Sequence, residues 1–231
     1  MTTKTNRLLS QEVLGMFQPL PIAFDEKDHS YVWKPNQERM KYSVTQVCSV
    51  LKTQEELDNI ERHRPSWEPR GNAVHKAGEL FMDGFPKEEL INGAYDEWIK
   101  PMFDCPFFED FRPLATEFRM CDRERSIGGS CDALGVDTLT DRFVLLDIKS
   151  QSRRSSQPYS TDAQMGGYVR MINEWFGIEI DECLTLWVRP GKTTLGDSQD
   201  PQRCLDAFEE CWGLFQAKQD LCGTVQSMQR S

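Results

Sequence analysis

In the N-terminal part of the chain, apolar residues recur mainly at the three- and four-residue spacing of amphipathic helices. This spacing predicts helices over residues 7–17, 70–82 and 87–102. A further helix is predicted over TQEELDNIERH, and Pro65 interrupts it. An earlier helix is predicted after Tyr42, with Ser43 or Thr45 as its N-cap. In PIAFDEKDHSYVWKPN, two apolar and aromatic runs surround a polar tip, which predicts a β-hairpin.

Farther along, the pattern changes to the short apolar runs typical of strands. Three such runs follow one another, PLATEFRMC, IGGSCDALGVD and DRFVLLDIKS, with a turn predicted at 137–142. The polar loop QSRRSSQPYS leads into a helix over 161–175, and ECLTLWVRP is a further strand. Pro201 then opens an amphipathic helix that ends near Gln219. This order of elements predicts an α/β fold, a mixed central β-sheet flanked by helices.

The 231 residues suit a single domain. We expect residues 1–40 to form an N-terminal helix and hairpin extension, residues 42–190 the core, and residues 201–219 a C-terminal helix. No apolar run approaches the roughly 18 residues of a membrane span, and polar residues interrupt the start where a signal peptide is apolar. We therefore expect a cytosolic chain without membrane contact, whose eight cysteines, none spaced as C-x-x-C, are reduced thiols.

The charge balance narrows the classes of function. The chain has 27 Lys and Arg against 37 Asp and Glu, a net charge of −10. A protein that neutralises phosphates along its whole surface usually has an excess of basic residues, so the balance argues against indiscriminate nucleic-acid binding. A metal-dependent enzyme needs clustered carboxylates and is compatible with this balance.

Acidic residues on two consecutive strand runs are the strongest candidates for chemistry. Asp132 lies in GGSCDALGV, and fifteen positions on, LLDIKS contains Asp147 and Lys149. Residues two apart share a strand face, so Asp147 and Lys149 point the same way while Ile148 turns into the core. A hairpin of the two runs would bring Asp132 beside Asp147. A D-x-K sequence is also common as a surface ion pair, which is the alternative interpretation.

A pair of adjacent carboxylates favours a divalent cation, because two negative charges close together are costly without one. Mg²⁺ prefers oxygen ligands and keeps several waters, so two aspartates are an adequate set. A metal held in this way lowers the pKa of a bound water and shields the charge of a phosphodiester. Lys149 would then position or deprotonate that water, or stabilise charge on the phosphate.

Two pairs of helix residues add to this set. His75 and Glu79 are four apart and share one helix face, and His75 is a candidate imidazole ligand. Gln164 and Tyr168 are likewise four apart in QMGGY, where they can contact a phosphate backbone or brace Lys149. The two glycines between them weaken a helix, which indicates close packing. The plainer interpretations are a structural histidine and a polar surface helix.

Arginines beside these strands predict a positive rim for phosphate contacts. Arg153 and Arg154 follow the Lys149 strand directly, and Arg119, Arg123 and Arg125 flank the Asp132 strand. The alternative is that these arginines are solvated loop residues.

In order, GNAVHKAGE, ATEF, GGSCDALGV, LLDIKS and QMGGY resemble the motif series of RecB-type nucleases in the PD-(D/E)XK superfamily. The similarity runs from about Tyr42 to Pro190. That branch includes viral exonucleases, nuclease domains of bacterial recombination helicases and mitochondrial genome-maintenance exonucleases.

The resemblance implies a restriction-endonuclease-like core and a role for each matching residue. It implies that His75, Asp132, Asp147 and the backbone carbonyl of Ile148 hold Mg²⁺, or Mn²⁺ in its place, and that Lys149 is the catalytic lysine. Gln164 and Tyr168 match the motif that lines the nucleic-acid path. Two further acidic residues are candidates for the site: Glu117 stands where many members have an acidic residue on the preceding strand, and Glu79 shares the helix face of His75.

The function expected is hydrolysis of DNA phosphodiester bonds, in the cytoplasm of a bacterium or a phage-infected host cell. The chain shows no sequence-reading motif, so we expect an exonuclease acting on DNA ends or single strands. Two alternatives stay open. One is a catalytically silent nucleic-acid-binding or assembly module on the same fold, and the other is an interaction protein whose acidic surface mimics DNA.

Overall fold

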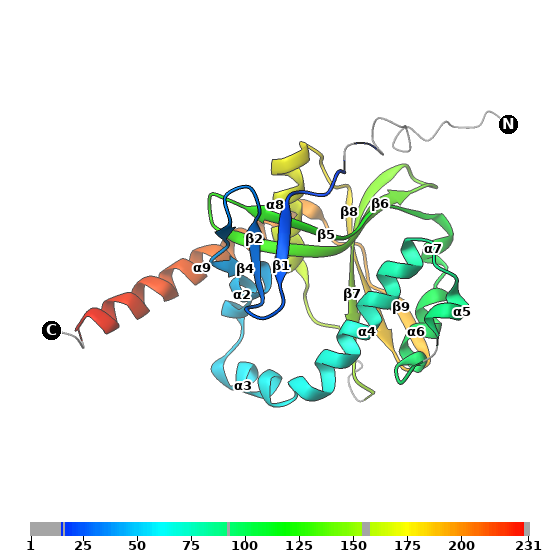
Figure 1. Cartoon of the computed structure of the whole chain (residues 1–231), viewed down its shortest axis with the longest axis horizontal. Helices are drawn as coiled ribbons and strands as arrows, with labels where there is room; N and C mark the ends of the chain where they lie inside the picture. The colour runs from blue at the N-terminus through cyan, green and yellow to red at the C-terminus, as the bar shows by residue number, and fades with distance from the viewer. Residues whose placement is uncertain (1–14, 16, 92, 154–157, 229–231) are drawn as a thin grey trace.

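The computed structural model describes residues 15, 17–91, 93–153 and 158–228, with side chains to residue 221. A six-stranded mixed sheet forms the centre and helices cover both of its faces (Figure 1), which confirms the predicted α/β class. Within the described residues, no helix combines the length and apolar composition needed to cross a membrane.

The central sheet is organised around one long strand, β6 (Ile127–Asp137). Along one side, β6 pairs antiparallel with β5 (Phe111–Asp122). Its other side has two partners in succession, because β4 (Tyr42–Ser43) pairs parallel with its start and β7 (Arg142–Ser150) pairs antiparallel with its end. The sheet continues from β7 through the parallel strand β8 (Glu182–Arg189) to β9 (Lys192–Leu195). The two partners leave a split in the sheet, at residues 129–132 of β6.

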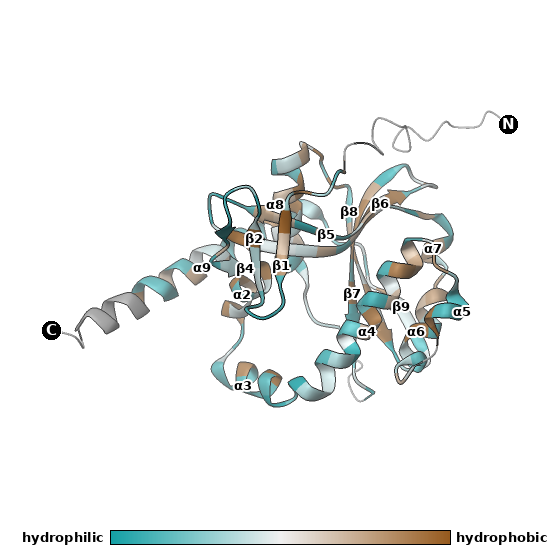
Figure 2. Ribbon diagram, in the orientation of Figure 1, coloured by the Kyte–Doolittle hydropathy of each residue, from teal (hydrophilic) through white to brown (hydrophobic). Residues whose placement is uncertain are grey.

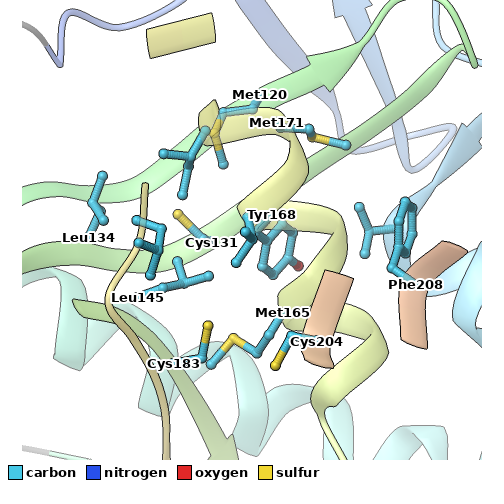
Figure 3. Close-up of a cluster of buried hydrophobic side chains, with 14 of the residues drawn as sticks. Met120, Cys131, Leu134, Leu145, Met165, Tyr168, Met171, Cys183, Cys204 and Phe208 are labelled. Atoms are coloured by element: carbon cyan, nitrogen blue, oxygen red, sulfur yellow. The ribbon is translucent and has the colours of Figure 1, made fainter. Parts of the chain in front are cut away.

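Helices pack on the two faces of the sheet with separate apolar cores. On one face, α4 (Arg64–Met82) and α6 (Asp96–Phe103) cover the side chains of β7 and β8. On the other face lie α2 (Val44–Cys48), α8 (Asp162–Phe176) and α9 (Pro201–Met228). Figure 2 shows hydrophobic residues along the strands between these layers, and Figure 3 shows the second core, in which Tyr168 lies among apolar side chains. The cysteines with described side chains are free, and Cys131 and Cys183 are buried.

The N-terminal hairpin forms a small sheet of its own, from β1 (Ile22–Asp25), β2 (Ser30–Trp33) and β3 (Glu38–Arg39). This sheet rests on the central one because Gly128 leaves room for the ring of Tyr31. A Cβ atom built at Gly128 would lie 2.4 Å from that ring. The pairing of β1 with β2 confirms the hairpin predicted at 21–36. Through Tyr31, this hairpin contacts the central sheet beside the split.

Several predicted element boundaries are wrong. The chain re-enters a helix directly after α3 (Gln54–Arg62), so α4 begins at Arg64 and not at residue 70, because proline is tolerated in a first helical turn. The helix predicted at 87–102 is divided into α5 (Lys87–Leu90) and α6, where Gly93 donates its N–H to Asp96.

Some short elements were not predicted, and one predicted helix lies mostly outside the described residues. The short elements η2 (Ser49–Leu51), α7 (Phe107–Asp110) and β9 were not predicted, and α9 continues past residue 219 to Met228. Most of the helix predicted at 7–17 lies outside the described residues.

Candidate active site

The two aspartates meet at the split in the central sheet. The β6–β7 ladder ends at the pair Ala133 and Leu146, so Asp132 and Asp147 stand opposite each other one step beyond it. Here the Asp132 side chain continues the ladder, because its Oδ2 accepts the Ile148 backbone N–H at 2.5 Å. The predicted juxtaposition of Asp132 with Asp147 is present, and the Ile148 side chain is buried as expected.

Asp132 also joins the sheet to α4. Its Oδ1 accepts a hydrogen bond from His75 Nδ1 at 2.7 Å. The His75 side chain is 33% exposed and that of Asp132 is 11% exposed, so the pair lies at the opening of the site. Helix α4 is fixed there because Val74 and Ala77 are buried in the core beneath it.

Asp147 and Lys149 share one strand face and form a close ion pair. Lys149 Nζ lies 3.0 Å from Asp147 Oδ1 and 2.9 Å from Oδ2. The contact with Oδ2 has an ion-pair distance but not the geometry of a hydrogen bond, and this buried oxygen forms none with the described residues. A buried carboxylate oxygen without a hydrogen bond is unusual and marks a position where a ligand can bind.

Helix α8 holds the lysine in place. Gln164 accepts a hydrogen bond from Lys149 Nζ at 3.0 Å, and its amide donates to Asp147 Oδ1 at 3.1 Å and to the Tyr168 hydroxyl at 3.0 Å. Tyr168 is only 3% exposed. The geometry therefore matches the bracing interpretation of this pair, and contact with a nucleic acid stays a prediction.

The predicted close packing at the α8 glycines is present. A Cβ atom at Gly166 would lie 1.9 Å from the carbonyl oxygen of Cys204 on α9. Only a glycine permits the two helices to approach this closely.

The pKa values of the two aspartates are shifted in opposite directions. Burial lowers the pKa of His75 and raises that of Asp132, but their mutual attraction outweighs both effects, so the pKa of His75 is raised and that of Asp132 is lowered. Burial raises the pKa of Asp147, and the opposing charge of Lys149 does not fully offset it. Burial lowers the pKa of Lys149, but Asp147 together with Tyr159 and Asp132 outweighs burial, so the pKa of Lys149 is raised. Ionised Asp147 is thus the group with most to gain from an added cation.

Of the two further acidic candidates, only Glu117 joins this centre. The β5–β6 register places Glu117 opposite Asp132, and Ser130 donates a hydrogen bond to Glu117 at 2.8 Å. Burial and the nearby Asp132 charge raise the pKa of Glu117. Glu79 instead pairs with Lys76 at 2.8 Å on the surface of α4.

The predicted arginine rim is only partly available to phosphates. Arg153 is 62% exposed but pairs with Glu97, and Arg154 lies outside the described residues. Arg123 pairs with Glu38 and Arg125 with Glu209, so these two arginines are already neutralised by the protein.

Sequence reasoning missed two aromatic residues that border the centre. Tyr31 comes from the N-terminal hairpin, and burial together with the charges of Glu117 and Asp132 raises its pKa. Tyr159 follows the polar loop. Burial and the charge of Asp147 raise its pKa, and the charge of Lys149 partly offsets this rise. Gly128, a strand glycine facing the hairpin, is the one signal in the sequence that could have indicated the Tyr31 contact.

The donor set fits a hard divalent cation held partly by water. Among the described residues, no three His, Cys, Asp or Glu side chains already stand together as a metal cage. Asp132 and Asp147 nevertheless offer two carboxylates, one with an oxygen that lacks a hydrogen bond. Mg²⁺ is commonly bound by one or two carboxylates and several waters, so these residues suit it better than a closed site of the zinc type.

No family model and no curated protein matches this chain. A solved structure described as "Crystal structure of SSO0001" is similar over 73% of this chain and 74% of that chain, with 11% sequence identity and a TM-score of 0.32. A likeness this distant carries no argument about function.

Proposed function

We propose that this chain is a metal-dependent DNA nuclease that hydrolyses phosphodiester bonds, acting as an exonuclease on ends or single strands. The observation that carries the proposal is the meeting of Asp132 and Asp147 at the split in the sheet, with Lys149 fixed beside them. The resemblance of the motif series to RecB-type nucleases supports the same assignment. A cytoplasmic location, in a bacterium or a phage-infected cell, belongs to this proposal.

The chain's own residues divide the work as follows. Asp132 and Asp147 would hold Mg²⁺ or Mn²⁺, with His75 and the Ile148 carbonyl as further candidate ligands. When bound, the ion supplies charge shielding and a lowered pKa for water. Lys149 Nζ, kept in place by Gln164, orients the attacking water or neutralises charge on the phosphate. The hydrogen bond from Ile148 N–H fixes the Asp132 carboxylate in its orientation.

The test is cleavage of end-labelled single-stranded, duplex and circular DNA with and without Mg²⁺. Asp147→Ala and Lys149→Ala should each abolish Mg²⁺-dependent cleavage and keep the circular dichroism of the folded chain. Lys76→Ala is the matched control, because Lys76 is an exposed lysine one residue after His75 whose ammonium pairs with Glu79 on the helix surface. Cleavage retained in both site variants would refute the proposal.

A catalytically silent module on the same fold makes a different prediction. Such a protein has no reason to keep a buried carboxylate oxygen without a hydrogen bond, whereas a cation site does. Calorimetric titration with Mg²⁺ or Mn²⁺ separates the two, because a silent module should show no specific metal binding. A DNA mimic would compete with DNA for a basic partner without turnover.

A further inference from the structure

A hollow of about 550 Å³ adjoins the candidate active site along strand β8. In the parallel β7–β8 ladder, Thr185 lies beside Asp147 and Trp187 beside Lys149. Side chains at paired positions of neighbouring strands point to the same face of a sheet. Thr185 and Trp187 line the hollow, so its floor continues the face that carries the aspartate and the lysine.

An exposed aromatic side chain stands where the hollow meets the active site. Tyr159 is 60% exposed, and its ring meets the ring of Trp187 edge-on at 5.0 Å. Trp187 is paired with Lys149 in the β7–β8 ladder, so a ring that packs on Trp187 lies on the side of the hollow toward that lysine. Trp187 is only 5% exposed and supports Tyr159 from below. The open area of Tyr159 is available to a flat, apolar group.

The hollow has an excess of cations, although the chain as a whole is acidic. Its lining includes the cations Arg189, Lys192 and Arg203 and the acids Asp162 and Asp197. Arg203 and Asp162 neutralise each other at 2.7 Å. Neither Arg189 nor Lys192 forms an ion pair with the described residues. A chain of net charge −10 thus keeps two unpaired cations against one acid at this place.

The floor of the hollow is polar and internally satisfied. Thr185 and Gln199 line the hollow and are both held by the buried Thr161 behind them. The Thr161 and Thr185 hydroxyls are 2.7 Å apart, and the Gln199 amide donates to Thr161 at 2.9 Å, so this part of the floor is a fixed surface. Among the lining groups, the Tyr159 ring and the two cations are suited to a base and a phosphate.

We propose that this hollow receives an unpaired nucleotide of the strand being cut, with its base stacked on Tyr159 and its phosphate near Arg189 and Lys192. Aromatic rings combined with cations are the usual means of binding single strands, because every base has a stacking face. A base within a duplex is paired and stacked already, so the hollow selects single-stranded DNA or frayed ends. The inference rests on the proposed function and specifies the substrate class at that site.

The test measures binding of a short fluorescein-labelled oligothymidylate and of a blunt duplex by fluorescence anisotropy, with EDTA present to prevent cleavage. Tyr159→Ala should weaken single-strand binding at least about fivefold, and Tyr159→Phe should keep it, because the ring does the stacking. Arg189→Glu with Lys192→Glu should weaken it further. Leu139→Ala and Lys218→Glu are controls, because both residues are exposed and distant in sequence from this hollow.

The possible outcomes separate this inference from the proposed function. Unchanged single-strand binding in both the tyrosine and the double charge variant overturns the inference, while Mg²⁺-dependent cleavage by the same preparations would leave the proposed function standing. An equal loss of duplex binding overturns the selection for single strands. If the variants lose single-strand binding but the unaltered chain never cleaves DNA, the hollow binds strands and the nuclease proposal is wrong.

Discussion

Two groups of charged side chains, each with a buried aspartate, lie on the same sheet, and both are held by helix α8. One is the candidate active site, and the other, here named the Asp122 cluster, consists of Asp122, Arg125, Arg170 and Glu209. In the Asp122 cluster, Asp122 accepts the Arg125 backbone N–H at 2.9 Å and Arg170 Nε at 2.8 Å. Arg125 holds both oxygens of Glu209 at 2.9 Å. Two carboxylates and two guanidinium groups balance, and all four carboxylate oxygens are bonded.

The candidate active site lacks this balance. Asp147 keeps an oxygen without a hydrogen bond, and its pKa is raised because burial outweighs the attraction of Lys149. Both regions place a buried aspartate beside a cation, so such a pair alone does not distinguish a stabilising cluster from a reactive one. The useful difference is whether the protein satisfies its own carboxylates. The Asp122 cluster ties β5 to α8 and α9, whereas the candidate active site leaves Asp147 Oδ2 without a hydrogen bond among the described residues.

The largest expected difference between the two regions is in cleavage. Asp132→Asn should lower Mg²⁺-dependent cleavage about a thousandfold or more, because a metal ligand contributes several kcal/mol of charge stabilisation in the transition state. The asparagine oxygen can still accept from His75 or Ile148, so the fold should persist. Asp122→Asn is the matched variant at a buried aspartate of the neighbouring strand, and it should retain cleavage in the fraction that is folded. Initial rates on end-labelled DNA, normalised to folded protein, measure both. Equal losses would show that the centre has no special role.

The stabilities of the two regions should respond in the opposite order. Asp122→Asn should lower the free energy of unfolding by about 2 kcal/mol, because it removes the charge of a fully buried carboxylate whose hydrogen bonds hold the Arg125 turn and the Arg170 side chain. Asp147→Asn should lower it by less in EDTA, because burial already disfavours the Asp147 charge, as its raised pKa indicates, and Lys149 keeps Gln164 as an acceptor and the nearby charge of Asp132. Urea unfolding followed by circular dichroism measures both. A larger loss for Asp147→Asn would mean that the Lys149 pair is mainly structural.

The sequence predicts local elements well where a pattern is long and bounded. The runs 127–137 and 142–150 form strands with those limits, since apolar and β-branched residues end there at turn residues. It predicts poorly where a short element depends on a partner. β4 has two residues and exists only because β6 pairs with it, and the polar β9 is a strand only because β8 is beside it.

The same distinction explains the candidate site. Asp132, Asp147 and Lys149 lie on adjacent strands, so one predicted hairpin brings them together. Tyr31 reaches the site from another sheet, through a contact that no local pattern encodes. The Asp122 cluster was missed for the same reason, because its partners are 48 and 84 residues apart in the chain. Arg125 was therefore interpreted as a phosphate contact, whereas it pairs with Glu209.

A smaller effect should appear where α8 reaches the active site. Gln164→Ala removes the acceptor that fixes Lys149, so cleavage should fall about 10- to 100-fold, as is usual for groups that orient catalytic residues. Gln164→Glu keeps an acceptor for Lys149 and should restore part of the rate. Gln202→Ala is the control, because Gln202 is exposed and bonds to Asp206 on the surface of α9. The rate constant should change more than the KM, since Gln164 acts through Lys149. A change confined to the KM would instead support direct contact between Gln164 and the nucleic acid.

The smallest expected effect is also the most direct comparison of the two regions, because it needs no substrate. Mg²⁺ at about ten times its Kd should stabilise the unaltered chain by about 1.4 kcal/mol, or roughly 3–5 °C in Tm for a chain of this size. Asp147→Asn should lose that shift, since the oxygen available to the ion is gone. Asp122→Asn should unfold at a lower temperature yet keep the full shift, because its cluster offers no oxygen to a cation. Differential scanning fluorimetry with EDTA as the reference measures all three. The same shift in every variant would place the ion elsewhere on the acidic surface, and the contrast between a satisfied and an unsatisfied cluster would then have no functional meaning.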